Sequence, residues 1–321
     1  MVPKLSILWS NGLSTYIYHR LHFQIINLVL MYQKILVLTT VLSIGILLWG
    51  CDNQSNQSNQ LRIMSYNIKY DNPDAGRYAW KNRKDQLSNL IQFYEPAVIG
   101  TQEGLLHQLE YLEDELESYK WIGVGRDDGT MSSEFSALFY DSTKVELIPN
   151  TENTIWLSET PTKPSMGWDA DFPRILTYGK FRDRSTGKSL WVFNTHFDHV
   201  GDTARTNSAK LIADSIASIA NERPAILTGD FNAPPEREPY AVLTSDNRTL
   251  QDAFNASDLE NVGPNFTFEG FDVRSDNDGR RIDYIFVNDK VDVQKHAIIS
   301  SFRDFGYPSD HLPVVADIKL K

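Results

Sequence analysis

Residues 225–232, Ala-Ile-Leu-Thr-Gly-Asp-Phe-Asn, decide the fold of this chain, because a short apolar run ends there in a carboxylate and an amide. Residues 225–228 have the length and composition of a buried strand. Alternate residues of a strand share a face, so Asp230 and Asn232 are delivered to the same side. A carboxylate and an amide at that position can bind a water, a metal or a phosphoryl oxygen. The plainer alternative is an Asp-Asn turn before Pro234.

Similar polar motifs end or interrupt other apolar runs along the chain. They are Asn67, Gln102-Glu103, Asn194-Thr195-His196, Arg281-Ile282-Asp283-Tyr284 and Ser309-Asp310-His311. Polar side chains at the ends of buried strands are costly to bury unpaired. Gathered in one cleft, they are what a divalent cation and a phosphate ester require.

Each motif taken alone also has an ordinary structural explanation. Glu103 could be an acidic residue at a helix start, favoured by the helix dipole. His196 could be a hydrogen-bonded histidine at a sheet edge, and Asp310-His311 a capping aspartate with a surface histidine. Asp283 could form an ion pair with a neighbouring arginine, Arg280 or Arg281.

The body of the chain alternates strand and helix patterns. Residues 61–68 read as a strand, residues 80–94 have helical spacing stopped by Pro96, and residues 97–103 form a short buried strand. Strand, helix and strand recur around residues 203–220, and hairpin-rich segments follow each unit. This order predicts two sheets packed face to face with helices outside.

The first 60 residues differ in composition from the rest. Residues 1–50 carry three basic and no acidic residues, and residues 35–49 are almost entirely apolar, as in a signal peptide; Met31 is an alternative start. Cys51, the only cysteine, follows in the position of a lipidated cysteine, and a buried cysteine after a membrane anchor is the alternative. The polar residues 51–60 read as a tether. These features predict a bacterial lipoprotein held at the cell envelope, with its folded domain at residues 61–321.

The body is strongly acidic. Of the 31 basic residues, 28 lie after residue 50, against all 42 acidic ones, so the body has a net charge of −14. Such a surface repels polyanions over long range. Non-specific nuclease activity is therefore disfavoured relative to a small phosphorylated substrate.

Taken together and in this order, the motifs closely resemble the endonuclease/exonuclease/phosphatase superfamily, the DNase I-like group. The resemblance covers about residues 61–321. Gly167-Trp168-Asp169, Pro173-Arg174 and Asp198-His199 further resemble a secreted bacterial subgroup of unassigned substrate. The resemblance implies an α/β fold, a four-layer sandwich of two mixed sheets flanked by helices, with Mg²⁺ or Mn²⁺ and phosphoester hydrolysis at the rim.

The resemblance also implies roles for individual residues. Asn67, Glu103 and Asp310 are expected to hold the metal. Asp230 is expected to activate a water that Asn232 helps to hold, and His311, oriented by Asp283, to stabilise charge on phosphorus. His196 is expected to contact the phosphate and help protonate the leaving group. Arg174 is a candidate for bidentate phosphate contact, unless it is a simple surface arginine.

Several functions remain open at this level. The substrate could be a phosphorylated small molecule, a lipid headgroup or a nucleic acid, which corresponds to a phosphodiesterase or phosphomonoesterase, a sphingomyelinase- or inositol-phosphatase-like enzyme, or a nuclease. A ligand-binding lipoprotein with a degenerate fold is the alternative that is not an enzyme. We expect a monomer, attached to the membrane through Cys51.

Overall fold

The computed structural model describes residues 19–36, 60–245, 250–271, 279–303 and 306–321, which belong to two units, Met1–Ser58 and Asn59–Lys321. In the first unit, residues 19–36 are helical with exposed side chains. Cys51, most of the predicted signal peptide and nearly all of the tether lie outside the described residues. Among the described helices, none combines the length and the apolar character needed to cross a membrane.

The first sheet of the second unit has six strands in the order β12-β13-β1-β2-β4-β3. β1 and β2 are parallel, and the other neighbours are antiparallel. The strands of this sheet are β1 (Leu61–Asn67), β2 (Val98–Gln102), β3 (Tyr119–Ile122), β4 (Leu138–Asp141), β12 (Val291–Ile298) and β13 (Val314–Leu320).

The second sheet has seven strands, ordered β10-β11-β9-β8-β7-β5, with β6 also paired to β7. β8 and β9 are parallel, and the other neighbours are antiparallel. Its strands are β5 (Val145–Leu147), β6 (Asn153–Trp156), β7 (Ile175–Asp183), β8 (Ser189–His196), β9 (Ala225–Asp230), β10 (Leu250–Asp252) and β11 (Asp283–Asn288).

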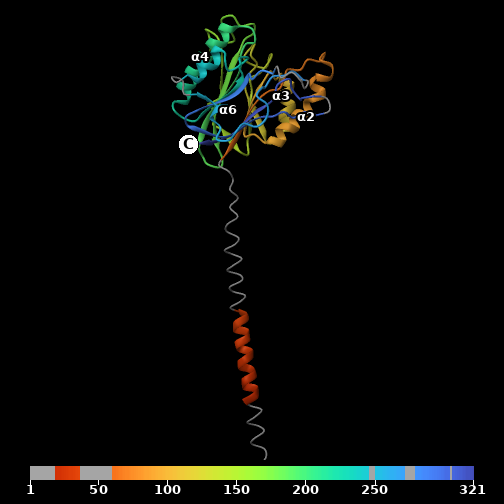
Figure 1. Cartoon of the computed structure of the whole chain (residues 1–321), viewed down its shortest axis with the longest axis vertical. Helices are drawn as coiled ribbons and strands as arrows, with labels where there is room; N and C mark the ends of the chain where they lie inside the picture. The colour runs from red at the N-terminus through yellow and green to blue at the C-terminus, as the bar shows by residue number, and fades with distance from the viewer. Residues whose placement is uncertain (1–18, 37–59, 246–249, 272–278, 304–305) are drawn as a thin grey trace, which may run out of the picture. The chain divides into compact units, whose positions relative to one another are not determined.

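Helices cover the outer faces of both sheets, as Figure 1 shows. α2 (Trp80–Tyr94) and α3 (Leu106–Glu115) pack on the first sheet, and α4 (Asp202–Ala220) and α5 (Glu238–Thr244) pack on the second. The short elements η1 (Gly76–Tyr78) and α6 (Ala253–Ala256) complete the set. The predicted four-layer α/β sandwich is therefore confirmed.

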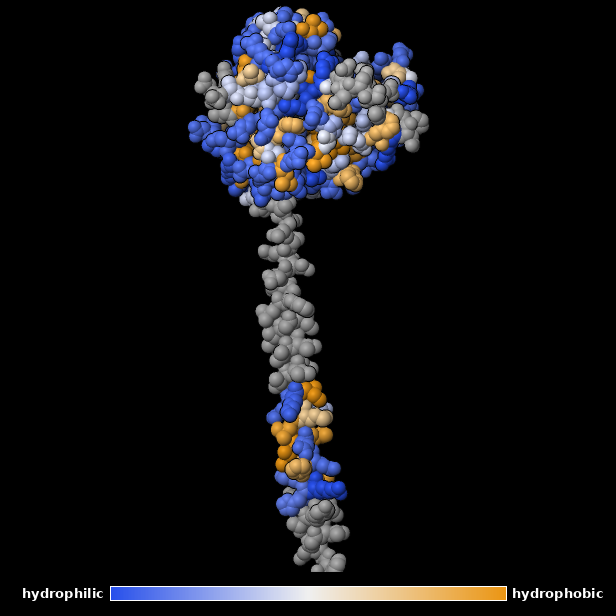
Figure 2. Space-filling model, in the orientation of Figure 1, coloured by the Kyte–Doolittle hydropathy of each residue, from blue (hydrophilic) through white to orange (hydrophobic). Residues whose placement is uncertain are grey.

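The sheets meet through an apolar core that contains side chains of both, such as Ile63 and Val98 from the first and Val192 and Ile226 from the second. Around this core the helices present apolar stripes to the sheets. The face of the body seen in Figure 2 is mainly hydrophilic, with scattered apolar residues, as expected for its acidic composition.

One polar bridge joins the sheets close to the rim that carries the predicted motifs. The amide nitrogen of Asn194 donates to the carbonyls of Thr101 and Ala137 at 2.8 and 3.0 Å, and its oxygen accepts from Gln102 at 2.7 Å. A Cβ at Gly100 would lie 2.0 Å from Thr228 Oγ1, so only glycine allows this close approach. Asn194 and Gln102 thus set the spacing of the two layers.

Candidate active site

In the first sheet, three strand ends bring predicted site residues to one rim. Asn67 ends β1, and Glu103 directly follows the parallel strand β2, so the two lie at neighbouring strand ends. β13 is antiparallel to β1, so the segment that precedes it, with Asp310 and His311, reaches the same rim. The hydroxyl of Ser309 fixes this segment by donating to the carbonyl of Asn67 at 2.6 Å.

The second sheet supplies the facing side of the rim. β8 and β9 are parallel and end in register at His196 and Asp230. β11 runs antiparallel to β9, so its first residue, Asp283, pairs with Asp230. A hydrogen bond from Asn67 to Asp230, 3.0 Å long, joins the two sheets at this point.

Three residues at this rim have left-handed backbone conformations although none is glycine. They are Lys69, Glu103 and Asn232, with φ of 55°, 61° and 46°. Such conformations are uncommon for these residue types and persist where the surrounding contacts determine them. They lie within two residues of the ends of β1, β2 and β9, where the chain leaves each strand.

The Asp230 carboxyl group is the centre of the rim. Its Oδ2 lies 3.0 Å from Asn67 Nδ2, 3.5 Å from His196 Nε2 and 3.7 Å from His311 Nε2. Its Oδ1 accepts from the backbone N–H of Asn232 at 2.9 Å. Burial, followed by the charge of Asp283, raises the pKa of Asp230 to about 7. A carboxyl with that pKa can take up and release a proton near neutral pH.

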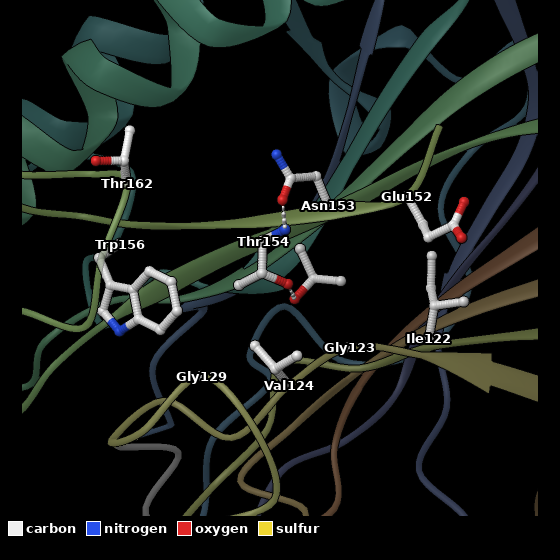
Figure 3. Close-up of a pocket in the computed structure, with 10 residues that line it drawn as sticks. Ile122, Gly123, Val124, Gly129, Glu152, Asn153, Thr154, Trp156 and Thr162 are labelled. Carbon is white, nitrogen blue, oxygen red and sulfur yellow. Dashed lines mark hydrogen bonds between the residues drawn. The ribbon is translucent and has the colours of Figure 1, made fainter. Parts of the chain in front are cut away.

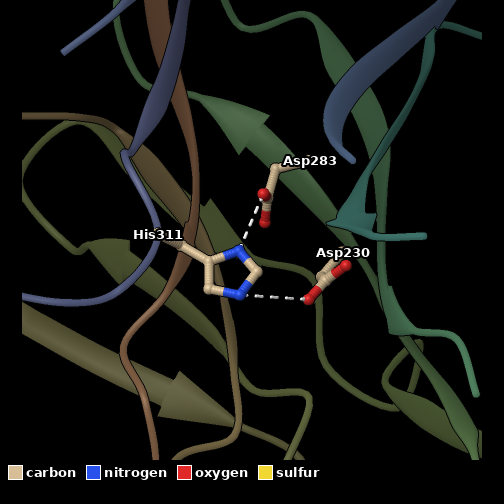
Figure 4. A group of neighbouring side chains, drawn as sticks. All are labelled: Asp230, Asp283 and His311. Carbon is tan, nitrogen blue, oxygen red and sulfur yellow. Dashed lines mark hydrogen bonds and ion pairs between the residues drawn. The ribbon is translucent and has the colours of Figure 1, made fainter. Parts of the chain in front are cut away.

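His311 lies between two carboxyl groups, as Figure 4 shows. Its Nδ1 is 2.9 Å from Asp283 Oδ2, while its Nε2 faces Asp230. Burial lowers the pKa of His311, but the charges of Asp283 and Asp230 outweigh it and raise the pKa above the ordinary histidine range. His311 is therefore held as a cation, in a ring orientation set by Asp283.

His196 is buried in a different electrostatic environment. The Asn232 amide nitrogen donates to the carbonyl of Phe197 at 3.0 Å and to His196 Nε2 at 3.2 Å, which makes Nε2 an acceptor and places the proton on Nδ1. Burial, followed by the positive charges of Arg174 and Arg126, lowers the pKa of His196 well below its ordinary value. His196 is neutral at pH 7 in the metal-free protein.

The residues predicted to bind metal lie beside Asp230, to which Asn67 is bonded. Asp310 Oδ2 and Glu103 Oε2 both contact Lys69 Nζ, at 3.4 and 3.2 Å, so one cation touches both carboxylates. Asn67 directs its amide nitrogen to Glu103 Oε1 at 3.1 Å, while its oxygen accepts from the Lys69 N–H at 3.0 Å. A ligand role for Asn67 would therefore require its amide to turn.

A second set of possible metal ligands overlaps the first. Asp230, Asp283 and His311 each offer a ligand atom within 4.8 Å of the others, close enough to hold an ion. However, the direct contact between His311 and Asp283 occupies one atom of each. Glu103 and Asp310 converge on a positive group without bonding to each other, which suits an oxygen-preferring cation better.

Arg174 is buried next to His196, and two of its five N–H groups have partners. Its Nε contacts Asp198 Oδ2 at 3.3 Å and its Nη2 lies 3.3 Å from His199 Nδ1, while Nη1 is buried with no partner among the described residues. The alternative of a surface arginine is wrong. These two contacts use two of the five N–H groups of the guanidinium, so a bidentate phosphate contact through Nη1 and Nη2 stays a prediction.

The Asp198 carboxylate accepts from Arg174 and from the N–H groups of Val200 and Gly201. We therefore expect Asp198→Asn to lower the free energy of unfolding at pH 7 by about 2 kcal/mol or more. Burial raises the pKa of Asp198, but the N–H groups of Gly201 and Val200 and the charge of Arg174 bring it down to about 2. A depressed carboxyl pKa stabilises the protein above the ordinary aspartate range, and this stability is lost as the pH falls towards 2.

Urea unfolding at pH 7 and pH 3 tests this expectation, with Asp74→Asn at an exposed aspartate as the control. The wild type and the control should lose more stability in acid than Asp198→Asn does. Equal losses in all three proteins would contradict the assignment.

Two charged residues beside His196, Glu134 and Arg126, carry no signal in the sequence. Glu134 makes a bidentate ion pair with Arg126 at 2.8 and 3.0 Å, and its Oε2 lies 4.0 Å from His196 Nδ1. Burial raises the pKa of Glu134 in spite of Arg126. Both residues lie in the irregular segment between β3 and β4, where no periodic pattern marks them. They pack in one cluster with Arg174 and His196.

A separate cavity of about 400 Å³ opens between β6 and the segment after β3, as Figure 3 shows. Trp156, Val124 and Ile122 form its apolar walls, and Asn153 and Thr154 its polar side. None of the predicted site residues lines it. The polar rim, and not this cavity, is therefore the candidate active site.

Comparison with known families agrees with this geometry. The model of the endonuclease/exonuclease/phosphatase family matches residues 64–311, a span that includes every residue of the rim. The chain belongs to the endonuclease/exonuclease/phosphatase family. Members of this family hydrolyse phosphoesters and usually use divalent metals.

Solved structures of this family superimpose on the body. A family member from Bacteroides vulgatus is 40% identical, with 82% of this chain and 99% of that chain covered and a TM-score of 0.78. A Bacteroides thetaiotaomicron protein described as a mannosyl-6-phosphatase is 37% identical, with 80% of this chain and 99% of that chain covered and a TM-score of 0.75.

A relative is also found by sequence alone. An uncharacterized protein of Acanthamoeba polyphaga mimivirus is 32% identical over 254 residues, 74% of this chain and 91% of its own.

Proposed function

We propose that this endonuclease/exonuclease/phosphatase family protein is a metal-dependent phosphoester hydrolase in which an activated water attacks phosphorus. The observation that carries the proposal is the position of Asp230. Its buried carboxyl group, with a pKa near neutrality, lies between Asn67, His196 and His311, next to the converging carboxylates of Glu103 and Asp310. This combination offers a base, a phosphate-binding surface and a cation site within one rim.

Glu103 and Asp310 are the residues that would hold Mg²⁺ or Mn²⁺, since both already face one positive group. Burial raises the pKa of Glu103, but Lys69, His311 and the Asn67 amide together bring it below its ordinary value, so the carboxylate is ionised at neutral pH. When bound, a divalent ion supplies Lewis-acid polarisation of a phosphoryl oxygen and a template for substrate binding.

The side chains of the rim each have a separate role in the reaction. Asp230 removes a proton from the attacking water, and the oxygen of Asn232 is available to that water because its nitrogen is bonded to His196 and Phe197. The cationic His311 stabilises negative charge on the phosphoryl group as the bond to water forms. The neutral His196 contacts the phosphate as a hydrogen-bond donor, and the leaving oxygen takes its proton from solvent water.

Within this reaction class, we propose a phosphomonoester of a carbohydrate as the substrate. The net charge of −14 on the body disfavours long polyanions, and a relative 37% identical is described as a mannosyl-6-phosphatase. A panel of mannose 6-phosphate, p-nitrophenyl phosphate, bis-p-nitrophenyl phosphate, a phospholipid and single-stranded RNA tests this proposal. Preference for RNA, for the lipid or for bis-p-nitrophenyl phosphate would contradict it.

Activity should depend completely on a divalent metal, and this is the direct test of the hydrolase proposal. We expect EDTA to abolish turnover of p-nitrophenyl phosphate, because the protein residues alone leave the phosphoryl charge without a Lewis acid. Dialysis followed by Mg²⁺ or Mn²⁺ should restore the rate. Turnover that is indifferent to chelator, or is absent with every substrate and metal, would remove the proposal.

The cellular location also remains a proposal. We propose that the protein is a monomer anchored through lipidated Cys51 to a bacterial envelope membrane, with residues 51–60 as a tether. The support is the charge and apolar pattern of residues 31–51. Replacing Cys51 with serine and fractionating the cells would test it, since the variant should leave the membrane fraction.

A further inference from the structure

Lys69 lies between the two carboxylates that would hold the metal. Its Nζ is 3.2 Å from Glu103 Oε2 and 3.4 Å from Asp310 Oδ2. The side chain of Lys69 is 28% exposed, whereas each carboxylate side chain is 11% exposed. The ammonium thus reaches from the surface into the position where the two acids converge.

The backbone of Lys69 is fixed, but its side chain has a route to solvent. Its N–H donates to Asn67 Oδ1 at 3.0 Å, and Arg83 donates to the carbonyls of Lys69 and Ile68. The ammonium itself lies 4.7 Å from the centre of the Tyr70 ring, which is partly exposed. Four rotatable bonds separate Nζ from this fixed backbone, so the charge can move while the loop stays in place.

A metal ion and this ammonium cannot occupy the site together. Mg²⁺ bonds to carboxylate oxygens at about 2.0–2.1 Å. An ion bonded to both Glu103 and Asp310 would fill the space that Nζ occupies, and two positive groups in that space repel. Either Lys69 or the metal can therefore neutralise the two acids, but not both.

We propose that Lys69 is a resident counter-cation, which neutralises Glu103 and Asp310 in the metal-free protein and must leave before a divalent ion can bind. The inference rests on the proposed function, because it assumes that these two carboxylates are the metal ligands. The apparent metal affinity then equals the intrinsic affinity multiplied by the fraction of molecules in which Lys69 has moved away. It also prevents uncompensated repulsion between buried carboxylates while no metal is present.

Calorimetric titration of the EDTA-treated, dialysed whole chain with MgCl₂ at pH 7.5 tests this inference. We expect Lys69→Met to bind Mg²⁺ roughly tenfold more tightly than the wild type, because the competing charge is gone. Lys69→Arg, which keeps a cation in place, should stay close to the wild type. Lys81→Met removes an exposed lysine on α2 and is the control for the change in net charge.

Thermal unfolding gives a readout that does not involve catalysis. Without metal, Lys69→Met should melt at a lower temperature than Lys81→Met, and saturating Mg²⁺ should raise its melting temperature by more than that of the wild type. Equal or weaker Mg²⁺ binding by Lys69→Met would overturn the counter-cation role. If neither the wild type nor Lys69→Met binds Mg²⁺ or Mn²⁺, the proposed metal site itself fails. Glu103→Gln, which should abolish binding in both backgrounds, confirms that the measured site is this one.

Discussion

Replacing His311 with alanine is expected to lower turnover of p-nitrophenyl phosphate by roughly two orders of magnitude or more. His311 is buried, cationic and faces Asp230, and it is the positive side chain best placed to stabilise charge that develops on phosphorus. Alanine removes that charge and leaves Asp283 without its partner, 2.9 Å away. Steady-state kinetics with saturating Mg²⁺ measures the loss, which should appear in kcat.

The comparison with Asp283→Asn makes this result specific. Asp283 acts through His311, by fixing the ring and sustaining its charge, so its loss should cost about one to two orders of magnitude. The double variant should be little slower than His311→Ala, because the two residues form one unit. His107→Ala, at an exposed histidine on α3, is the control and should keep full activity. A His311→Ala enzyme within a few-fold of the wild type would refute the role.

The strand-end motifs were readable from the sequence because each follows an apolar run whose pattern identifies a strand. Residues 225–230 form β9, and Asp230 comes to lie opposite His196 and Asp283 as the strand pairing requires. Convergence of Glu103 with Asp310 could not be derived from spacing alone. It depends on β2 being parallel and β13 antiparallel to β1, which was expected only through the family resemblance.

The sequence was uninformative where a role depends on a long-range side-chain contact. Arg174 was expected to contact phosphate, which stays a prediction. Its contacts with Asp198 and His199, which orient the guanidinium, are not revealed by anything in the local pattern. Glu134 lies in an irregular segment, and Lys69 looks like an ordinary surface lysine. Its role depends on the two carboxylates on either side of it, which come from distant parts of the chain.

Asp230→Asn should also lower turnover by roughly two orders of magnitude or more, because the asparagine keeps the shape of the side chain but cannot accept a proton. The wild-type rate should fall as the pH is lowered through the Asp230 pKa, since the base must be ionised. That pKa is about 7 in the metal-free protein, and a bound cation will shift it downward. The variant should lose this acidic limb of the pH–rate profile.

The same variant distinguishes the two possible positions of the metal. If Glu103 and Asp310 are the ligands, Asp230→Asn should bind Mg²⁺ with an affinity close to that of the wild type while its kcat falls. If the ion instead lies among Asp230, Asp283 and His311, whose ligand atoms are within 4.8 Å of one another, affinity and turnover should fall together. Calorimetry on Asp230→Asn and Glu103→Gln therefore assigns each carboxyl group. The proposed mechanism requires weak binding only in Glu103→Gln, because a base needs to be near the metal without being one of its ligands.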